Sequence, residues 1–324
     1  MNNRRRLVIV LGASALAAPF DSFAQQQGKV WRVGFLSVRH MEFVDTDYYY
    51  GPFRQGMQKL GYVEGKNLII EWRSAEGKDE RLPELAVELV RWKPDVLITA
   101  ATPAARAAQK ATTTIPIVII NVGEPVADGL VKSLVRPGGN STGFSNMNVE
   151  LVPKLVQMLH DTVPKTTRVA VLANGNMPKD YQALAQKLGI ILLPIEASTP
   201  QAIANGFAEM TRQKAEALVV LRDAFLNQQK SQIVALATRQ RLPSIGGYSD
   251  YAEAGGLMSY GQNIRENAWR AATYVDKIFK GAKVGDLPVQ RPTIFEFVLN
   301  LKTAKALGIT MPQTILVQAT KVIE

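Results

Sequence analysis

The sequence contains no cysteine and only two histidines in 324 residues. Without cysteine, the chain has no disulfide bond, no thiolate nucleophile, no lipidated cysteine anchor and no thiolate metal site. His40 and His160 lie far apart in the chain and leave little for a zinc site or a catalytic triad. These absences argue against most enzyme classes. We therefore expect a protein that is not an enzyme and that holds no metal and no cofactor.

Long apolar runs and runs of like charge are also absent. No apolar stretch reaches about 18 residues, so we expect no helix that spans a membrane. Lys and Arg number 38 against 28 Asp and Glu, but the basic residues are scattered after Arg6. This pattern favours a solvated basic surface over a nucleic-acid-binding surface, so we expect no nucleic-acid partner.

The N-terminal segment has the pattern of an export signal. Three arginines at positions 4–6 precede an apolar run over residues 7–18, and Ser22-Phe23-Ala24 then offers small residues before a cut at Gln25. We predict a signal peptide over residues 1–24 and a periplasmic protein. Sec-type export is the expected route, and a twin-arginine signal is the alternative.

From residue 30 onward, short β-rich runs alternate with helical patterns. The expected strands are residues 30–37, 68–73, 95–99, 117–122, 168–173, 190–195, 217–221, 244–246, 257–260 and 293–300. The expected helices are residues 53–60, 82–90, 103–110, 129–135, 178–188, 201–212, 226–240, 264–280 and 301–307. Near-continuous apolar strands separated by helices predict parallel sheets that are covered on both faces. The fold class is therefore α/β, with two doubly wound, Rossmann-like lobes.

Clusters of glycine and proline mark where the chain passes between the lobes. The string RPGGNSTG at residues 136–143 separates the two halves, and later elements return to both of them. Two lobes with such late returns are joined by three crossover strands, which form a hinge. We predict lobe 1 at residues 30–143 plus 262–291, and lobe 2 at residues 144–261 plus 292–324.

Loops that carry catalysis are missing from the sequence. The phosphate-binding patterns GxxxxGK[ST] and GxGxxG do not occur where a strand meets a helix, and residues 143–147 (GFSNM) only approach the nucleophile elbow GxSxG. Asp45 and Asp47 are too few acidic residues for a calcium loop. We predict no catalytic residues, so binding is the expected activity.

Small polar residues follow the predicted strands, at the edge where doubly wound sheets bind ligands. Hydroxyls and free backbone amides at helix N-termini suit a carboxylate, whereas Glu124 and Asp223, one from each lobe, suit an ammonium group. Aromatic residues, Tyr181 among them, are placed to close around an apolar side chain. The candidate ligand-binding residues are Ser37, Thr99, Thr102, Asn121, Gly123, Glu124, Asn174, Asp223, Phe225, Tyr248 and Tyr260.

Two of these features have a second interpretation. Thr, Asn and Asp at strand ends are also ordinary helix caps, and Thr102 before Pro103 is expected to cap its helix whether or not it binds a ligand. The run Tyr48-Tyr49-Tyr50 either covers the mouth of the cleft or packs under the first helix.

Several segments resemble a known family. They are VWRVGFLS (30–37), GYVEGKNL (61–68), NVGEPVADG (121–129), RPGGNSTGFS (136–145), GGLMSY (255–260) and KTAKALGITMP (302–312). With the export signal, they are similar to ABC-transporter substrate-binding proteins of the tryptophan/phenylalanine-binder type, across essentially the whole mature chain. The resemblance implies a type I periplasmic-binding-protein fold that closes on a ligand, and its characterised members bind aromatic amino acids.

The resemblance also implies a set of cleft residues. Carried over by position, they are Ser37, Thr102, Asn121, Glu124 and Asp223. Glu124 stands where many relatives have Asp before the proline, and its extra methylene moves the acceptor, which makes an amino-acid ligand less secure.

The leading hypothesis is a periplasmic solute-binding receptor of an ABC uptake transporter. It captures an amino acid or an aromatic or carboxylate compound by hinge closure, and it delivers this small molecule to an inner-membrane permease with its ATPase. We expect the receptor to be a monomer. The alternative is a periplasmic sensor that presents a solute to a membrane receptor. A transcription-factor ligand core lacks its N-terminal DNA-binding domain here, and an exported hydrolase lacks a nucleophile–base pair.

Overall fold

The computed structural model describes residues 29–39, 49–146, 148–175 and 181–324. The predicted signal peptide, His40, Asp45, Asp47 and Tyr48 lie outside the described residues. The chain divides into two compact units, Met1–Val30 and Trp31–Glu324. Lys29 and Val30, which are exposed, are all that is described of the first unit, so everything below concerns the second.

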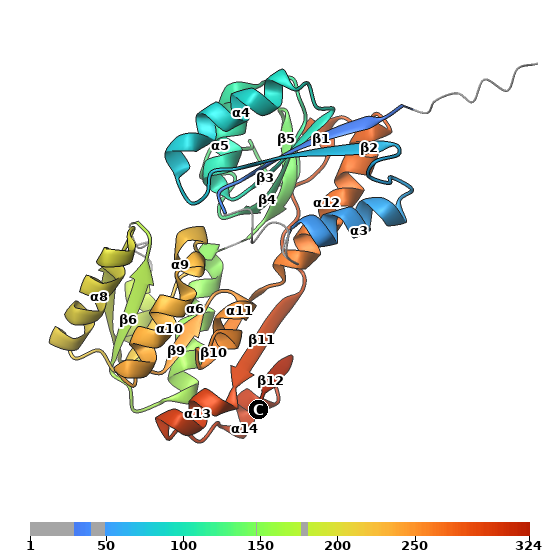
Figure 1. Ribbon diagram of the computed structural model, residues 1–324. Coiled ribbons are helices and arrows are strands. Elements are labelled where there is room, and N and C mark those ends of the chain that lie inside the picture. The colour runs from blue at the N-terminus through green and yellow to red at the C-terminus, as the bar shows by residue number, and fades with distance from the viewer. Residues whose placement is uncertain (1–28, 40–48, 147, 176–180) are drawn as a thin grey trace, which may run out of the picture. The chain divides into compact units, whose positions relative to one another are not determined.

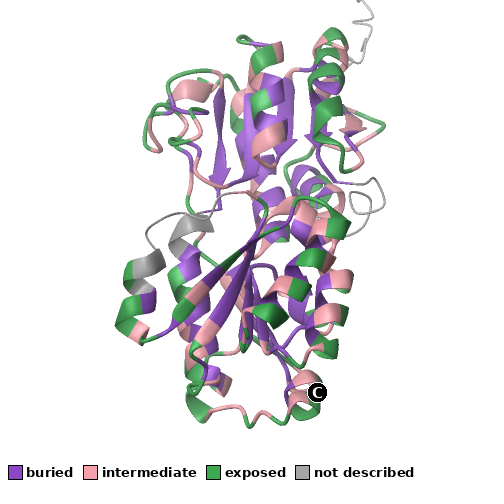
Figure 2. Ribbon diagram, turned by 90° about the vertical axis from the view of Figure 1, so that its left-hand side faces the viewer, coloured by how far each residue is buried: buried purple, intermediate pink, exposed green. Residues whose placement is uncertain are grey.

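The first sheet has five parallel strands in the order β2-β1-β3-β4-β5. Their bounds are β1 (Trp31–Ser37), β2 (Leu68–Ser74), β3 (Val96–Ala100), β4 (Ile117–Val122) and β5 (Ser141–Ser145). Residues of β3, β4 and β5 are all buried, as the near-continuous apolar runs predict. Figure 2 shows these strands buried along most of their length.

Helices cover both faces of the first sheet (Figure 1). One face packs on α3 (Tyr50–Lys59) and α12 (Ile264–Phe279), and the other packs on α4 (Leu82–Arg91) and α5 (Thr102–Ala111). The short 3-10 helix η2 (Asp79–Arg81) precedes α4. Because α12 comes from late in the sequence, the first lobe is built from two separate stretches of the chain.

The second sheet has seven strands in the order β12-β11-β10-β9-β8-β6-β7. Their bounds are β6 (Arg168–Ala173), β7 (Ile191–Glu196), β8 (Ala217–Val220), β9 (Ser244–Gly246), β10 (Met258–Gln262), β11 (Phe295–Asn300) and β12 (Lys321–Ile323). All neighbouring strands are parallel except β10 and β11, which pair antiparallel.

The second sheet is also covered on both faces. One face packs on α6 (Asn148–Thr162), α7 (Tyr181–Leu188), α13 (Leu301–Leu307) and α14 (Gln313–Leu316). The other face packs on α8 (Pro200–Arg212), α9 (Ala224–Gln228), α10 (Lys230–Arg239) and α11 (Ser249–Glu253). The doubly wound α/β architecture predicted from the sequence is thus confirmed in both lobes.

The chain passes between the two sheets three times. It leaves the first sheet after β5, returns to it between β10 and α12, and leaves it again between the 3-10 helix η3 (Val284–Asp286), which contacts β5, and β11. In the described part of the chain, no helix is both long and apolar enough to cross a membrane.

Three local predictions were wrong. Residues 129–135 form no helix, because their amides bond to distant carbonyls, among them Lys132 N to Pro137 O at 2.9 Å. The helix predicted over 226–240 is two helices that meet at Gln229. The N-cap of α5 is Ala101 and not Thr102, whose hydroxyl donates to the Asp128 carboxylate at 3.3 Å.

The predicted seam at residues 136–143 contains the start of a strand. β5 begins at Ser141 and pairs with β4, so this string belongs in part to the first sheet. Gly143 has φ +137°, and a Cβ there would lie 2.0 Å from the Ile119 carbonyl oxygen. Only glycine allows this approach, which explains why the strand has so little β-forming character in the sequence.

Candidate functional site

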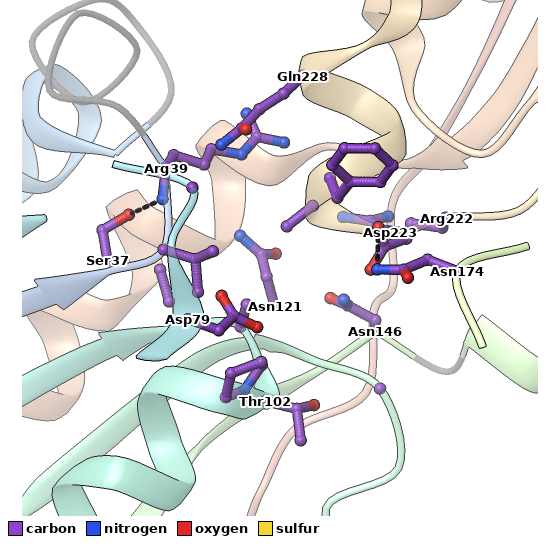
Figure 3. Close-up of a pocket in the computed structure, with 18 of the residues that line it drawn as sticks. Ser37, Arg39, Asp79, Thr102, Asn121, Asn146, Asn174, Arg222, Asp223 and Gln228 are labelled. Carbon is purple, nitrogen blue, oxygen red and sulfur yellow. Dashed lines mark hydrogen bonds between the residues drawn. The ribbon is translucent and has the colours of Figure 1, made fainter. Parts of the chain in front are cut away.

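A pocket of about 390 Å³ is lined by residues from both sheets. It lies at the carboxyl ends of the parallel strands, where Ser37 ends β1, Asn121 lies near the end of β4, and Asn174 and Arg222 follow β6 and β8. Side chains from both lobes point into it in Figure 3. This is the edge at which doubly wound sheets hold ligands.

Most of the residues predicted from the sequence are brought together here. Those that line the pocket are Ser37, Thr102, Asn121, Gly123, Asn174, Asp223, Phe225 and Tyr248. The side chain of Tyr181, the remaining aromatic candidate, lies outside the described residues.

Three predicted residues do not line the pocket. Thr99 lies inside β3 and is fully buried, with its side chain on the sheet face opposite to Ala100. Tyr260 faces the core of the second lobe, where it stacks on Phe295 at 5.7 Å between ring centroids. Glu124 lies half-buried in the turn that follows β4, away from the pocket wall.

Several lining residues were missed by the sequence analysis. They are Arg39, Tyr49, Asp79, Asn146, Arg222 and Gln228. Arg39 and Arg222 each follow a strand end by one or two positions, which is the signal that selected their neighbours Ser37 and Asp223. Asp79 belongs to η2, which no periodicity in the sequence marked. Tyr49 is 3% exposed and packs in the first core, so the tyrosine run lies under α3 and also reaches the pocket.

Two arginines and a tyrosine form a buried cluster at the pocket wall. The guanidinium of Arg222 lies 4.4 Å from the ring centroid of Tyr248, and that of Arg39 lies 5.6 Å from the same centroid. Both arginines are buried, at 7% and 4% exposure. Burial lowers the pKa of Arg222, and this effect is opposed first by Tyr248. We call these three residues the arginine–tyrosine cluster.

Two carboxylates, one from each lobe, also line the pocket. Asp223 caps α9, accepting from Leu226 N at 3.0 Å, and it accepts from Asn174 Nδ2 at 3.2 Å. Figure 3 shows Asp223 beside Asn174, with Asp79 nearer to Thr102. Partial burial raises the pKa of the Asp79 carboxyl, and the negative charges of Asp223 and Glu80 raise it further. The raised pKa indicates that Asp79 and Asp223 repel each other across the pocket.

Buried amides connect the pocket to the second crossing of the chain. Asn121 Oδ1 accepts from Gln262 Nε2 at 3.4 Å and from Asn267 Nδ2 at 3.3 Å. Gln262 Nε2 also donates to Asn146 Oδ1. Asn121 itself donates to the Tyr49 hydroxyl at 3.1 Å and holds a left-handed backbone conformation with φ 56°. The pocket lining is therefore hydrogen-bonded directly to the strand β10 and the helix α12.

The backbone at the start of α5 is also unusual. Ala101 lines the pocket with φ 78° and ψ 158°, a combination that residues with a side chain rarely adopt. It turns the chain sharply from β3 into α5, so that Thr102 and the amino end of this ten-residue helix face the pocket. Such a helix end favours negative charge.

The chemistry of the site suits binding of a polar molecule that carries both charges. It presents hydroxyls, amides, two arginines and two carboxylates within one pocket. Across the described ranges, no group of three or more His, Asp or Glu side chains is placed to hold a metal ion.

Known proteins resemble this chain along most of its length. A tyrosine-binding protein of Clostridioides difficile (strain R20291) is 28% identical over 262 residues, which are 79% of this chain and 75% of that protein. A conserved domain protein of Vibrio cholerae matches in structure with a TM-score of 0.83 and 29% identity, covering 91% of this chain and 100% of its own.

A Streptococcus pneumonia ABC domain in complex with L-Trp also matches with a TM-score of 0.83, at 25% identity, covering 90% of this chain and 99% of its own. The family of ABC transporter substrate binding proteins matches residues 41–323. The chain belongs to the ABC transporter substrate-binding protein family.

Proposed function

We propose that this chain is the exported receptor of an ABC uptake transporter and that its solute is an amino acid. Membership of the substrate-binding family supports the transport role, and an amino-acid ligand is in line with relatives described as a tyrosine-binding protein and as bound to L-Trp. The observation that carries the proposal is the pocket itself, because it offers separate partners for an ammonium group and for a carboxylate.

The ammonium group would bind between Asp79 and Asp223. Each carboxylate comes from a different lobe, and their mutual repulsion raises the pKa of Asp79 in the empty pocket. A positive charge between them removes this repulsion. Asp223 takes the role that the sequence analysis gave it, and Asp79 takes the role that was given to Glu124.

The carboxylate would bind at the end of β1 and the start of α5. Ser37 and Thr102 supply hydroxyl groups there, and the amino end of α5 supplies a favourable field. Since Ser37 Oγ already accepts from Arg39 N at 3.1 Å, its hydroxyl hydrogen is directed to another acceptor.

Ligand contacts to both lobes would favour a closed state and so drive hinge closure. We propose lobe 1 as residues 30–143 plus 262–291 and lobe 2 as residues 144–261 plus 292–324, bounds that fall close to the ends of β5 and β10. In this proposal the mature protein is a periplasmic monomer, residues 1–24 are its signal peptide, and an inner-membrane permease with its ATPase receives the solute.

A thermal-shift and calorimetric screen of mature protein tests the amino-acid assignment. Amino acids are compared with their deaminated acids, with their decarboxylated amines and with sugars. A ligand at 100 times its dissociation constant adds about 2.7 kcal/mol to the free energy of unfolding, so the melting temperature rises by several degrees. We expect this rise only for compounds with both charged groups. Stabilisation by sugars, or by no amino acid, would contradict the proposal.

A further inference from the structure

The arginine–tyrosine cluster gives the pocket a strongly cationic wall. Arg39 comes from the first lobe, and Arg222 and Tyr248 come from the second, yet both guanidiniums lie against one aromatic ring. All three side chains are less than 9% exposed and line the pocket. Tyr49, also buried at the pocket, has its ring centroid 5.8 Å from the Arg39 guanidinium.

Two buried like charges on one ring are costly. An aromatic ring attracts a cation, but more weakly than an anion does, and the two cations repel each other. The carboxylates nearby have other partners: Asp250 pairs with Lys230 at 3.0 Å, and Asp223 is held by Leu226 N and Asn174. An anionic group of the ligand, placed against Arg39 and Arg222, therefore stabilises the occupied pocket.

The same cluster makes the pocket a poor fit for a large aromatic side chain. Three aromatic residues line it, namely Tyr49, Phe225 and Tyr248. A guanidinium lies against each of the two tyrosines, which leaves Phe225 as the aromatic side chain without a cation against its ring among the described contacts. Most other lining side chains carry hydroxyl, amide or charged groups.

We propose that the preferred solute is an amino acid with an acidic side chain, and that its side-chain carboxylate lies against Arg39 and Arg222. This inference rests on the proposed function, which assigns the α-ammonium group to Asp79 and Asp223 and the α-carboxylate to the start of α5. The arginine–tyrosine cluster is then the determinant of specificity, and the chain differs in ligand from the relatives described with tyrosine and tryptophan.

Calorimetry on the unmodified mature protein tests this inference with matched ligands. L-glutamate is compared with L-glutamine, L-aspartate with L-asparagine, and all four with L-tryptophan and L-tyrosine. Because a charge-assisted bidentate contact replaces a neutral one, we expect the acid of one pair to bind at least about tenfold more tightly than its amide. Equal binding of acid and amide, or tighter binding of an aromatic amino acid, overturns the inference and leaves the proposed function standing. No binding by any amino acid overturns both.

Substitution of Arg222 then tests the residue itself. In Arg222→Met, we expect the acid to lose about tenfold in affinity while its amide changes by less than about threefold. Arg222→Lys retains part of the preference, since it keeps the charge but not the planar fork. Arg239→Met, an exposed arginine on α10, is the matched control and leaves both affinities unchanged. Equal losses for acid and amide in Arg222→Met overturn the inference, and if that variant does not fold, the ligand comparison decides alone.

Discussion

Asp79 is the residue whose ionisation most directly links pH to binding. Its pKa is raised above 3.8 by partial burial, then by Asp223 and by Glu80. The empty pocket therefore favours the protonated form of Asp79. An ammonium group between Asp79 and Asp223 favours the ionised form instead, so binding releases a proton in the pH range of this carboxyl group.

The affinity for an amino acid is therefore expected to fall as the pH is lowered through the raised pKa of Asp79. Arg39 and Arg222 stay charged over this range, so the fall reports on the carboxylates. In Asp79→Asn, the affinity near neutral pH is lower by about tenfold and the pH dependence is weaker. Calorimetry from about pH 7 down to about pH 4 measures both quantities.

Glu84→Gln, which removes an exposed carboxylate from the first turn of α4, is the control. It should reproduce the pH dependence of the unmodified protein. An unchanged affinity and pH profile in Asp79→Asn would exclude Asp79 as a partner of the ammonium group.

At the scale of single elements, β5 depends on one glycine. Its pairing with β4 brings the Ile119 carbonyl oxygen within 2.0 Å of the place where a Cβ of residue 143 would lie, and the φ of +137° suits glycine alone. β5 also receives the chain of the third crossing, because Gln290 N donates to Gly143 O at 2.8 Å. A change at this position therefore disturbs the strand and the crossing together.

Gly143→Ala is expected to lower the free energy of unfolding by about 3 kcal/mol or more, because the backbones of β4 and β5 must separate. Urea denaturation followed by circular dichroism measures the loss. Gly139→Ala is the matched control, since a Cβ at Gly139 meets nothing within 4 Å, and it should change the stability by less than about 1 kcal/mol. Equal effects of the two substitutions would contradict the close approach of β4 and β5.

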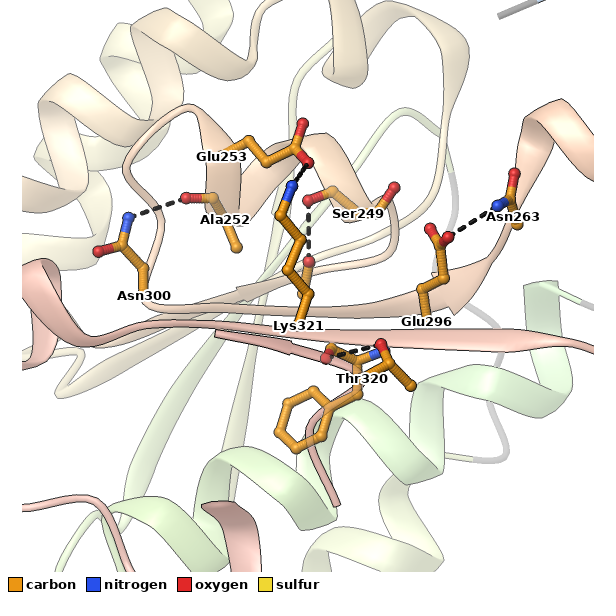
Figure 4. Close-up of polar contacts among 10 residues, drawn as sticks. Ser249, Ala252, Glu253, Asn263, Glu296, Asn300, Thr320 and Lys321 are labelled. Carbon is orange, nitrogen blue, oxygen red and sulfur yellow. Dashed lines mark hydrogen bonds and ion pairs between the residues drawn. The ribbon is translucent and has the colours of Figure 1, made fainter. Parts of the chain in front are cut away.

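The second and third crossings are tied to each other at the level of β10, α12 and β11. β10 and β11 pair antiparallel, and Asn263, the N-cap of α12, donates to the Glu296 carboxylate at 2.7 Å. Figure 4 shows this contact beside those of the C-terminal strand, where Thr320 bonds to the backbone of β11 and Lys321 pairs with Glu253 at 2.7 Å. The two crossings therefore form one connected hinge element.

For the whole molecule, the amide group around Asn121 joins the pocket to this hinge element. A ligand that contacts Asn121 and Asn146 also acts on Gln262, which lies at the end of β10. Binding and hinge motion thus share hydrogen bonds, and a ligand that contacts both lobes biases the population of conformers.

Small-angle X-ray scattering of mature protein should show a smaller radius of gyration when the amino acid identified by calorimetry is added in excess. The Asp79→Asn variant, at a concentration of ligand that saturates only the unmodified protein, should not show this change. An identical scattering curve with and without a saturating ligand would contradict hinge closure.

The sequence by itself determined the order of the elements and much of the site. Apolar runs such as those of β3 and β4 predict buried parallel strands because a sheet covered on both faces must be apolar on both sides. The rule that ligands bind at strand carboxyl ends then located Ser37, Asn121, Asn174 and Asp223 at the pocket. These features depend on local periodicity and on the position of a residue in its own strand.

Only the tertiary structure decided which charges face the ligand. Arg39, Asp79 and Arg222 come together from both lobes, and no local pattern records contacts across such sequence distances. The same holds for Glu124 and Tyr260, whose neighbours in three dimensions direct them away from the pocket. Gly143 marked a seam in the sequence and proved to be part of a strand, because a close approach between two backbones exists only once both strands are in place.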